Sequence, residues 1–357
     1  MKPHDYKTLL NKSINAFLKD ALGVVYRNPA RLIFVFRTIL WQRKAARKRI
    51  EYEKQGLQVP PYMIISITNR CNLQCRGCYS KAQHRPIAKE ISYDKLRSVI
   101  AEAKDLGISF IFLAGGEPLM RAEILEITKD LPEIIFPLFT NGLLITDEII
   151  IRLRKQKNVI PVISMEGYET DTDSRRGPGV YGQLQGTLEK IKRFGLFYGL
   201  SFTVSRINFE TLTNALFIDK LMASGCQLFF FVEYIPVKEA TEDLVITDEQ
   251  RAALPTILDS FRAKFPGLFV SFPGDEEAFG GCLSAGRGFI HISAEGDLEP
   301  CPFAPYSDTN INNLSLKEAL QSGLLKKIRQ NCDVLTETSG GCALWEKREW
   351  LRSLREN

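Results

Sequence analysis

The chain has 357 residues, of which 45% are hydrophobic and 25% are charged. This composition excludes a disordered, collagen-like or disulfide-scaffold protein, and the length allows one large domain or two to three smaller ones. The charge is uneven, because residues 1–60 hold 13 basic and 4 acidic side chains while the rest of the chain is mildly acidic. A nucleic-acid-binding protein would spread Lys and Arg over its folded body, so we expect no nucleic-acid partner.

Residues 1–55 are predicted to form a basic, amphipathic helical extension. Apolar side chains recur at helical spacing over residues 9–25, which gives one apolar stripe. Asp5 and Asp20 interrupt this stretch and argue against a secretory signal.

A second segment of the extension, residues 32–41, is apolar and aromatic but too short for a membrane span, which takes about 20 apolar residues. From residue 27 to residue 49 the chain has eight basic side chains and no acidic one. An apolar face beside a basic cluster is typical of a helix in an anionic membrane interface. A helix packed on the enzyme body with a solvated basic flank is the other interpretation, and a membrane-surface contact through residues 1–50 stays open.

Residues 56–240 are predicted to form an α/β domain around a parallel sheet. Strand-like apolar runs alternate with amphipathic helical runs, which indicates right-handed βαβ units. Six units in this length favour a partial (βα)6 barrel of the TIM type, because a closed eightfold barrel takes about 250 residues. The expected strands cover residues 63–68, 109–114, 134–140, 159–165, 200–204 and 228–234.

Residues 241–281 are predicted to be a connector with one helix, which a capping box opens at Thr247. Residues 282–357 are predicted to form a small α+β domain. We expect a β-hairpin within residues 288–301 and one helix that opens at Ser315 and continues through Leu324 and Ile328.

Cys71, Cys75 and Cys78 follow the first predicted strand with the spacing CxxxCxxC. Three thiolates at this spacing can hold three corners of a cubane iron–sulfur cluster and leave the fourth iron open, as catalytic metal sites do. A zinc site would need a fourth ligand, and His84 is the nearest candidate. A disulfide would leave one of the three thiols unpaired. The motif also stands at the carboxyl end of a strand, where α/β enzymes place their sites.

With these cysteines the chain resembles the radical S-adenosylmethionine (radical SAM) enzymes. The residues 115–118 look like the family's GGEP element, which binds the methionyl amino group, and residues 140–142 (Thr-Asn-Gly) end the third strand as in many members. Ser164 and Arg176 match the segment that holds the ribose and carboxylate of the cofactor. The resemblance implies cofactor-binding roles for Tyr79, Gly115, Gly116, Glu117, Pro118, Asn141, Ser164 and Arg176.

Two positions depart from the family pattern. The residue before the third cysteine is often aromatic in the family and is Gly77 here, with Tyr79 just after the motif. The usual Asp of the fourth-strand segment is Glu166. Neither residue belongs to the predicted iron ligands.

The resemblance implies an enzyme that uses a [4Fe–4S] cluster and S-adenosylmethionine (SAM), with Cys71, Cys75 and Cys78 as the catalytic ligands. Reductive cleavage of SAM would give a 5′-deoxyadenosyl radical that abstracts hydrogen from a substrate C–H bond. Such chemistry implies a reducing partner such as flavodoxin or ferredoxin and a reducing compartment, so we expect a cytoplasmic protein. A peripheral position at the inner face of the membrane is the alternative that the basic extension leaves open.

The C-terminal cysteines resemble a truncated SPASM/twitch extension, in which a cysteine, a hairpin and a Pro-Cys pair surround an auxiliary cluster. The resemblance implies one auxiliary [4Fe–4S] cluster, with zinc as the alternative metal at this site. Cys332 is either a further ligand or a buried thiol, and Cys226 is expected to be a core thiol. The implied metal ligands of this domain are Cys282, Cys301, Cys332 and Cys342.

The substrate class stays open at this level. A peptide or protein is the commonest use of SPASM-type extensions, whereas a membrane lipid or isoprenoid would account for the basic extension. A non-catalytic iron–sulfur protein for electron transfer or scaffolding is the alternative from another class. The candidate acid/base residues are Glu233, Tyr234, Asp275, Glu276 and Glu277.

Overall fold

The computed structural model describes residues 3–26, 29–83, 90–273, 279–335 and 341–356. A single sheet with the strand order β7-β6-β5-β4-β3-β2-β1-β8-β9 forms its centre. All neighbours from β7 to β8 pair in parallel, and only β9 runs antiparallel to β8. The strands are β1 (Tyr62–Thr68), β2 (Phe110–Gly115), β3 (Phe136–Thr140), β4 (Val159–Ser164), β5 (Gly199–Val204), β6 (Leu228–Glu233), β7 (Leu268–Phe272), β8 (Phe289–Ile292) and β9 (Leu298–Glu299).

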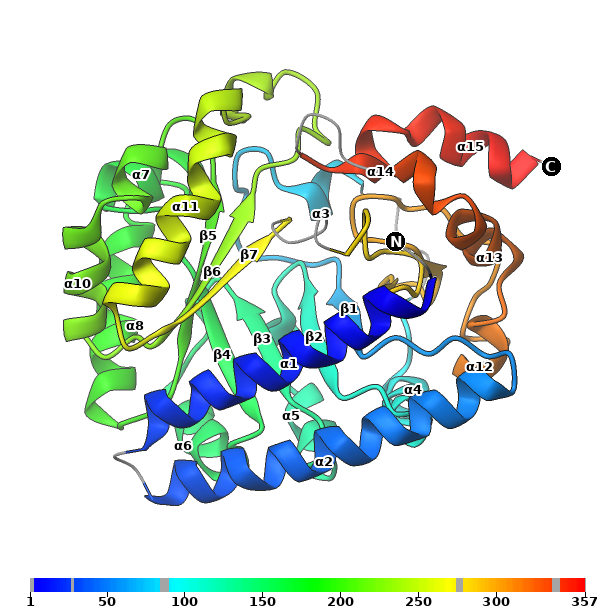
Figure 1. Ribbon diagram of the computed structural model, residues 1–357. Coiled ribbons are helices and arrows are strands. Elements are labelled where there is room, and N and C mark those ends of the chain that lie inside the picture. The colour runs from blue at the N-terminus through cyan, green and yellow to red at the C-terminus, as the bar shows by residue number, and fades with distance from the viewer. Residues whose placement is uncertain (1–2, 27–28, 84–89, 274–278, 336–340, 357) are drawn as a thin grey trace.

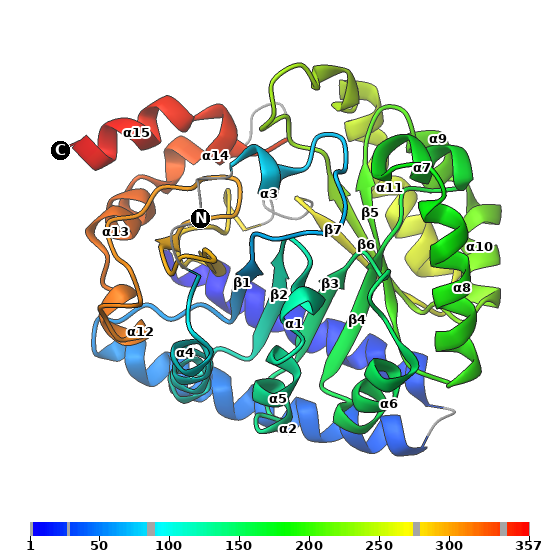
Figure 2. The same cartoon turned by 180° about the vertical axis from the view of Figure 1, so that it is seen from behind.

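Helices between the strands cover the outer face of this sheet (Figure 2). Helix α4 is an example of how the sequence favours these helices. Its apolar stripe is buried, Ser92 caps its first turn and Gly107 ends it in a left-handed conformation. The connecting elements are α3 (Tyr79–Ala82), α4 (Tyr93–Leu106), η1 (Pro118–Arg121), α5 (Ile124–Lys129), α6 (Asp147–Gln156), α7 (Glu169–Arg176), α8 (Val180–Arg193), α9 (Phe209–Leu212), α10 (Ala215–Ala223) and η2 (Glu242–Leu244). The predicted partial barrel is confirmed, and all six expected strands are present.

Helix α1 (Pro3–Val25) lies across the inner face of the sheet (Figure 1). Tyr6, Leu10 and Ile14 pack in one apolar cluster with Phe110 of β2, and further along the helix Ala21 packs in a second cluster with strands β4, β6 and β7. The predicted apolar stripe of the extension is therefore buried against the barrel. For this helix the packing interpretation is confirmed.

Helix α2 (Pro29–Lys54) runs along the amino-terminal ends of the strands. The amide of Gln42 donates to the Ser109 carbonyl at 3.4 Å, just before β2, and the guanidinium of Arg49 donates to the Gly107 carbonyl at 2.6 Å. No helix of the described ranges is both long and apolar enough to cross a membrane.

The predicted connector contains the expected helix α11 (Asp248–Lys264), which Thr247 opens through a capping box. It also contains β7, which the sequence did not predict. Residues 268–272 form this strand and extend the parallel sheet beyond β6.

The C-terminal region contains the expected hairpin, β8 and β9, but the hairpin joins the barrel sheet through β1. The helix that opens at Ser315 ends after one turn, and Ser322 caps a new helix that begins at Gly323. The prediction of one continuous helix was therefore wrong. The elements of this region are α12 (Leu316–Ala319), α13 (Gly323–Gln330), η3 (Cys332–Leu335), α14 (Ala343–Glu346) and α15 (Arg348–Glu356).

Candidate active site

The cysteine motif forms a loop at the carboxyl end of β1. Thr68 turns the chain there, because its hydroxyl donates to Glu90 at 2.6 Å and accepts from the backbone N–H of Arg70 at 3.1 Å. The Sγ atom of Cys71 accepts from the backbone N–H of Leu73 at 3.4 Å. Parallel strands end at one edge of a sheet, so the loop lies beside the ends of β2 and β3.

The three thiols of this loop are half-buried and stand within eight residues of the chain. Burial raises the pKa of the Cys71 thiol, and the charges of Cys75 and Cys78 raise it further. Among the described residues, no three or more His, Cys, Asp or Glu side chains are gathered tightly enough to hold a single metal ion. Three thiolates are the donor set of a [4Fe–4S] cluster with one open iron, whereas a structural zinc site would need a fourth ligand. His84, the candidate zinc ligand, lies outside the described residues.

The glycine element comes into backbone contact with this loop. A Cβ on Gly116 would lie 2.2 Å from the carbonyl oxygen of Arg70, and a Cβ on Gly115 would lie 2.6 Å from that of Thr68. Gly115 also has φ of +109°, which favours glycine. Only glycine therefore fits at these two positions beside the cysteine loop.

Glu117 is fully buried and points away from solvent. Its carboxylate accepts from the Thr140 hydroxyl at 2.8 Å and from the backbone N–H groups of Leu119 and Asn141 at 3.0 and 2.7 Å. Burial raises the pKa of this carboxyl, and the hydrogen bonds oppose that shift. The carboxylate thus ties the end of β2 to the end of β3, and Pro118 follows it as the first residue of η1. The role predicted for Glu117 as an ammonium acceptor stays a prediction.

Asn141 connects the third strand end to the cysteine loop. Its Nδ2 donates to Asn72 Oδ1 at 2.7 Å and lies 3.9 Å from Cys71 Sγ. Its Oδ1 accepts from the backbone N–H of Leu143 at 3.0 Å. The Thr-Asn-Gly turn therefore lies against the first cysteine.

Arg176 has a protein carboxylate as its partner. Glu166 Oε1 accepts from Arg176 Nη2 at 2.5 Å and from Arg175 Nη1 at 2.6 Å, and Glu166 is 1% exposed. Glu166 Oε2 accepts from the backbone N–H of Thr203 at 3.1 Å. Glu166 thus holds both arginines at the end of β4, where Ser164 is half-exposed.

Arg175 lies beside the cysteine loop, although the sequence analysis did not name Arg175 as a candidate site residue. Its carbonyl accepts from the backbone N–H of Arg76 at 2.7 Å. Burial lowers the pKa of the Arg175 guanidinium, but the charge of Glu166 raises it above its ordinary value, with further contributions from Cys75 and Cys78. The adjacent Arg175-Arg176 pair was visible in the sequence, but only the fold shows that the first arginine faces the cysteines.

Tyr234 is a second residue whose place the sequence did not show. The side chain is 2% exposed, and its hydroxyl donates to Thr241 Oγ1 at 2.6 Å. Its ring lies against Gly77, because a Cβ there would be 2.7 Å from the ring carbon Cε2. Arg76 Nη2 pairs with Asp243 at 2.7 Å, so the segment after β6 clamps the cysteine loop.

The C-terminal region brings Cys282, Cys301 and Cys342 together. Burial raises the pKa of the Cys301 thiol, and the charges of Cys342 and Cys282 raise it further. The backbone of Cys332 lies against Gly281, the residue before Cys282. The predicted role of Cys332 as a metal ligand stays a prediction.

Tyr79 lies between the two groups of cysteines. Burial raises its pKa, as do the charges of Cys78 on one side and Cys301 on the other. Its ring contacts the Phe303 ring edge-on at a centroid distance of 5.2 Å. Tyr79 therefore lies near cysteines of both groups.

The remaining candidate residues have other surroundings. Glu233 is buried and accepts from Arg251 Nη2 at 2.8 Å, and burial raises its pKa. Burial raises the pKa of Cys226 to about 12, and this thiol lies in the core as expected. Asp275, Glu276 and Glu277 lie outside the described residues.

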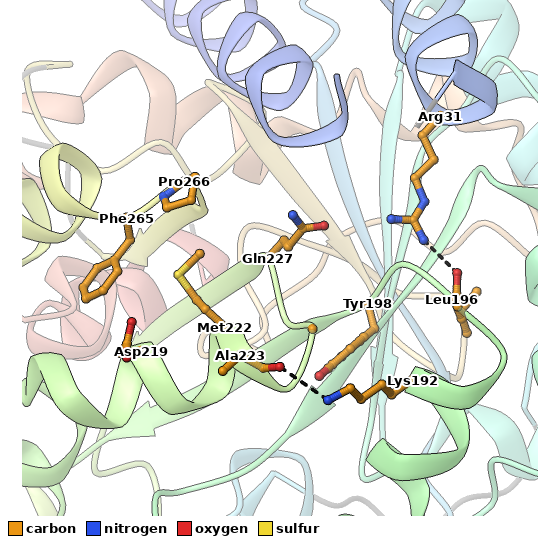
Figure 3. Close-up of a pocket in the computed structure, with 12 residues that line it drawn as sticks. Arg31, Lys192, Leu196, Tyr198, Asp219, Met222, Ala223, Gln227, Phe265 and Pro266 are labelled. Carbon is orange, nitrogen blue, oxygen red and sulfur yellow. Dashed lines mark hydrogen bonds between the residues drawn. The ribbon is translucent and has the colours of Figure 1, made fainter. Parts of the chain in front are cut away.

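A cavity of about 590 Å³ lies at the other end of the strands, beside Arg31 and Tyr198 (Figure 3). Arg31 donates to the Gly195 carbonyl at 2.7 Å, and Lys192 donates to the Ala223 carbonyl at 3.4 Å. Lys192, Gly195 and Ala223 lie shortly before the first residues of β5 and β6. The cavity is therefore at the amino-terminal ends of the strands, remote from the cysteines at the carboxyl ends.

Comparisons with known proteins agree with this site. The profile of the family described as "Radical SAM superfamily" matches residues 65–215. The chain is 25% identical to the AdoMet-dependent heme synthase of Methanosarcina barkeri, over 81% of this chain and 89% of that protein. It is also 25% identical to the mycofactocin maturase MftC of Mycolicibacterium smegmatis, over 82% of this chain and 77% of that protein.

The fold is similar to that of Streptococcus suis SuiB in its crystal structure. The TM-score is 0.65 at 18% sequence identity, over 84% of this chain and 76% of that one. The matched family segment begins within β1 and includes the cysteine loop, the glycine element and the arginine pair. Residues 65–215 therefore match the radical SAM superfamily, whose members use a [4Fe–4S] cluster and SAM, and the protein is an enzyme.

Proposed function

We propose that the enzyme cleaves SAM reductively and removes a hydrogen atom from a C–H bond of its substrate. The observation that carries this proposal is the grouping of Cys71, Cys75 and Cys78 on one loop, in backbone contact with Gly115 and Gly116. When bound, the cluster and SAM supply a carbon radical that can take hydrogen from an unactivated C–H bond.

The protein's own residues then position these groups. The three thiolates hold the cluster, and the carbonyl oxygens of the glycine element accept from the methionyl ammonium group. Glu117 keeps Asn141 against Cys71 through its hydrogen bonds. Glu166 orients the arginine pair, whose remaining N–H groups can bind a carboxylate of the cofactor.

We also propose that Cys282, Cys301 and Cys342 hold one auxiliary [4Fe–4S] cluster. Burial raises the pKa of Cys301 and the charges of Cys342 and Cys282 raise it further, which supports a site that the three thiols share. The thiols of such a site must lose their protons when the metal binds, because burial raises the pKa of Cys301.

A peptide or protein is the substrate class that we propose. The support is similarity to MftC, to the PqqA peptide cyclase of Granulibacter bethesdensis, and to SuiB, which was crystallised with the precursor peptide SuiA. In the described parts of the extension, α1 (Pro3–Val25) and α2 (Pro29–Lys54) are two helices that pack on the barrel. We therefore expect the barrel mouth and the C-terminal region to recognise the peptide.

A tetrapyrrole is the second candidate substrate. The similarity to the AdoMet-dependent heme synthase of Methanosarcina barkeri covers 81% of this chain and 89% of that protein. A membrane lipid is less favoured, because the basic helix α2 lies at the amino-terminal ends of the strands and the cysteines lie at the carboxyl ends.

The test is formation of 5′-deoxyadenosine by anaerobically reconstituted enzyme with dithionite or reduced flavodoxin as the electron source. Cys75→Ala should abolish the product, and the core variant Cys226→Ala should retain it. No product from the unaltered chain would support the non-catalytic iron–sulfur alternative. Deuterated peptides and tetrapyrroles then separate the two substrate classes, because the true substrate transfers deuterium into 5′-deoxyadenosine.

A further inference from the structure

Helix α2 presents an apolar and basic face to solvent. This α2 outer face consists of Ile33, Phe36, Arg37, Leu40, Lys44 and Arg47, which recur at helical spacing. Ile33 is 62% exposed, Phe36 59% and Leu40 50%. Six of the twelve large hydrophobic side chains that are exposed in the described structure lie within residues 26–50, so the exposure is concentrated on this segment.

The opposite face of the same helix is fixed to the enzyme body. Thr38 and Gln42 are buried, and Ser109 exchanges hydrogen bonds with Gln42. Arg49 is buried and donates to the Gly107 carbonyl, and Arg31 donates to the Gly195 carbonyl. The helix is therefore held in one orientation over its length of about 39 Å, taken at 1.5 Å per residue for 26 residues. The exposed apolar side chains follow from this rigid placement.

The charge of the α2 outer face has one sign. Arg37 lies over the Trp41 ring at 5.1 Å, and no ion-pair partner for Lys44 or Arg47 occurs among the described residues. The chain has no acidic residue from position 27 to position 49. A partner for this surface must accept apolar side chains and several cations together.

These properties select among the classes of partner. A nucleic acid would bind the cations but would leave Ile33, Phe36 and Leu40 without an apolar partner. A second copy of this chain in a twofold interface would bring the same basic face against itself, which like charges oppose. An anionic bilayer accepts both components, because its acyl region takes apolar side chains and its headgroups attract Lys and Arg.

The position of the face determines how the enzyme would sit. The hydrogen bonds of Gln42 and Arg49 place α2 at the amino-terminal ends of the strands, while Cys71 follows the carboxyl end of β1 (Figure 1). A bilayer on the α2 outer face would therefore leave the cysteine sites facing the aqueous phase. Such an arrangement suits a substrate delivered from water.

We propose that the α2 outer face docks the enzyme on an anionic membrane surface, with the active site turned away from the bilayer. Helix α1 takes no part in this contact through its apolar stripe, since that stripe is buried against the sheet. The proposal concerns a surface remote from the cysteines and stands independently of the proposed reaction.

The test is co-flotation of the full-length holoenzyme with vesicles of phosphatidylcholine alone or with added phosphatidylglycerol. We expect flotation only with the anionic vesicles, and loss of flotation at 1 M salt, where the Debye length falls to about 3 Å. Phe36→Asp with Leu40→Asp should reduce the bound fraction at least tenfold. Lys44→Gln with Arg47→Gln should also weaken binding about tenfold or more.

Matched controls use exposed residues elsewhere on the enzyme. Leu216→Asp changes a side chain of α10 that is 76% exposed, and Lys190→Gln with Lys326→Gln removes two exposed charges. These variants should float like the unaltered enzyme. All variants should keep their iron content, which shows that they fold.

Three results would overturn the proposal. The first would be that the unaltered enzyme does not float with anionic vesicles. The second would be that the variant with both Phe36→Asp and Leu40→Asp floats as well as the controls. The third is dissociation of a dimer by this variant in sedimentation measurements without lipid, which would assign the face to self-association.

Discussion

The ring of Tyr234, at the end of β6, lies directly against the backbone of Gly77 in the cysteine loop. A Cβ at position 77 would be 2.5 Å from the Tyr234 hydroxyl oxygen, and Gly77 has φ of +67°. The aromatic side chain that this family often carries at position 77 is absent, and an aromatic ring from another strand occupies the adjacent space. The two residues therefore form one packing unit at the cluster loop.

Gly77→Ala should displace either the loop or the Tyr234 ring. Overpacking of this kind costs about 1–3 kcal/mol, and the positive φ adds strain. We expect a lower iron content per chain after anaerobic reconstitution. Gly182→Ala in helix α8 is the matched control, because its Cβ would meet nothing within 4 Å. Equal iron contents in the two variants would contradict the packing argument.

Glu166→Gln should destabilise the protein, because it leaves the buried Arg176 and the partly buried Arg175 without their counter-charge. Removing one partner of a buried ion pair costs about 3–5 kcal/mol. The midpoint of thermal unfolding should fall well below that of the exposed control Glu189→Gln. SAM affinity, measured by equilibrium dialysis, should fall as well. An unchanged midpoint would show that Glu166 does not hold the arginine pair.

Glu117 should make the stability of the fold depend on pH. Burial raises its pKa above the ordinary value of 4.5, so the folded protein holds this proton more tightly than the unfolded chain. The stability that it contributes is present below pH 4.5 and is lost as the pH rises through the raised pKa. Glu117→Gln should remove that component and flatten the unfolding free energy over this window. Parallel pH profiles of the two proteins in urea titrations would be the opposite result.

His291 connects the C-terminal hairpin to the barrel. Its Nε2 lies 2.8 Å from Ser66 Oγ on β1, and its Nδ1 lies 2.7 Å from Glu299 Oε2 on β9. His291→Leu leaves the buried Glu299 without this partner, which costs about 1–3 kcal/mol. Amide exchange of residues 289–299 should become faster. Ser66→Ala, which leaves the His291–Glu299 contact intact, should have a smaller effect.

Much of the barrel follows from local sequence pattern. Alternating strand and helix runs predicted the six central strands, and the capping box at Thr247 predicted the start of α11. Strand β7 was missed because it lies in the predicted connector, and its place is set by pairing with β6. The predicted helix from Ser315 was too long, because Ser322 caps a new helix at Gly323.

The site was predictable only where its residues stand close together in sequence. The cysteine loop and the glycine element have fixed spacings, which the motif displays. The contacts of Arg175 with the loop and of Tyr234 with Gly77 join segments about 100 and 157 residues apart, so no local pattern shows them. The hydrogen bonds of the Glu117 carboxylate with Thr140 and Asn141 also join segments that are distant in sequence, so the motif did not predict them.

The central claim is that Cys71, Cys75 and Cys78 hold a cluster with one iron left open for SAM. Electron–nuclear double resonance of the reduced, reconstituted enzyme with SAM labelled at its methionyl nitrogen and carboxylate tests this claim most directly. We expect hyperfine coupling of the labels to the cluster in the unaltered enzyme and in Cys226→Ala, and none in Cys75→Ala. A reduced cluster in the unaltered enzyme that shows no coupling to either label would contradict the account.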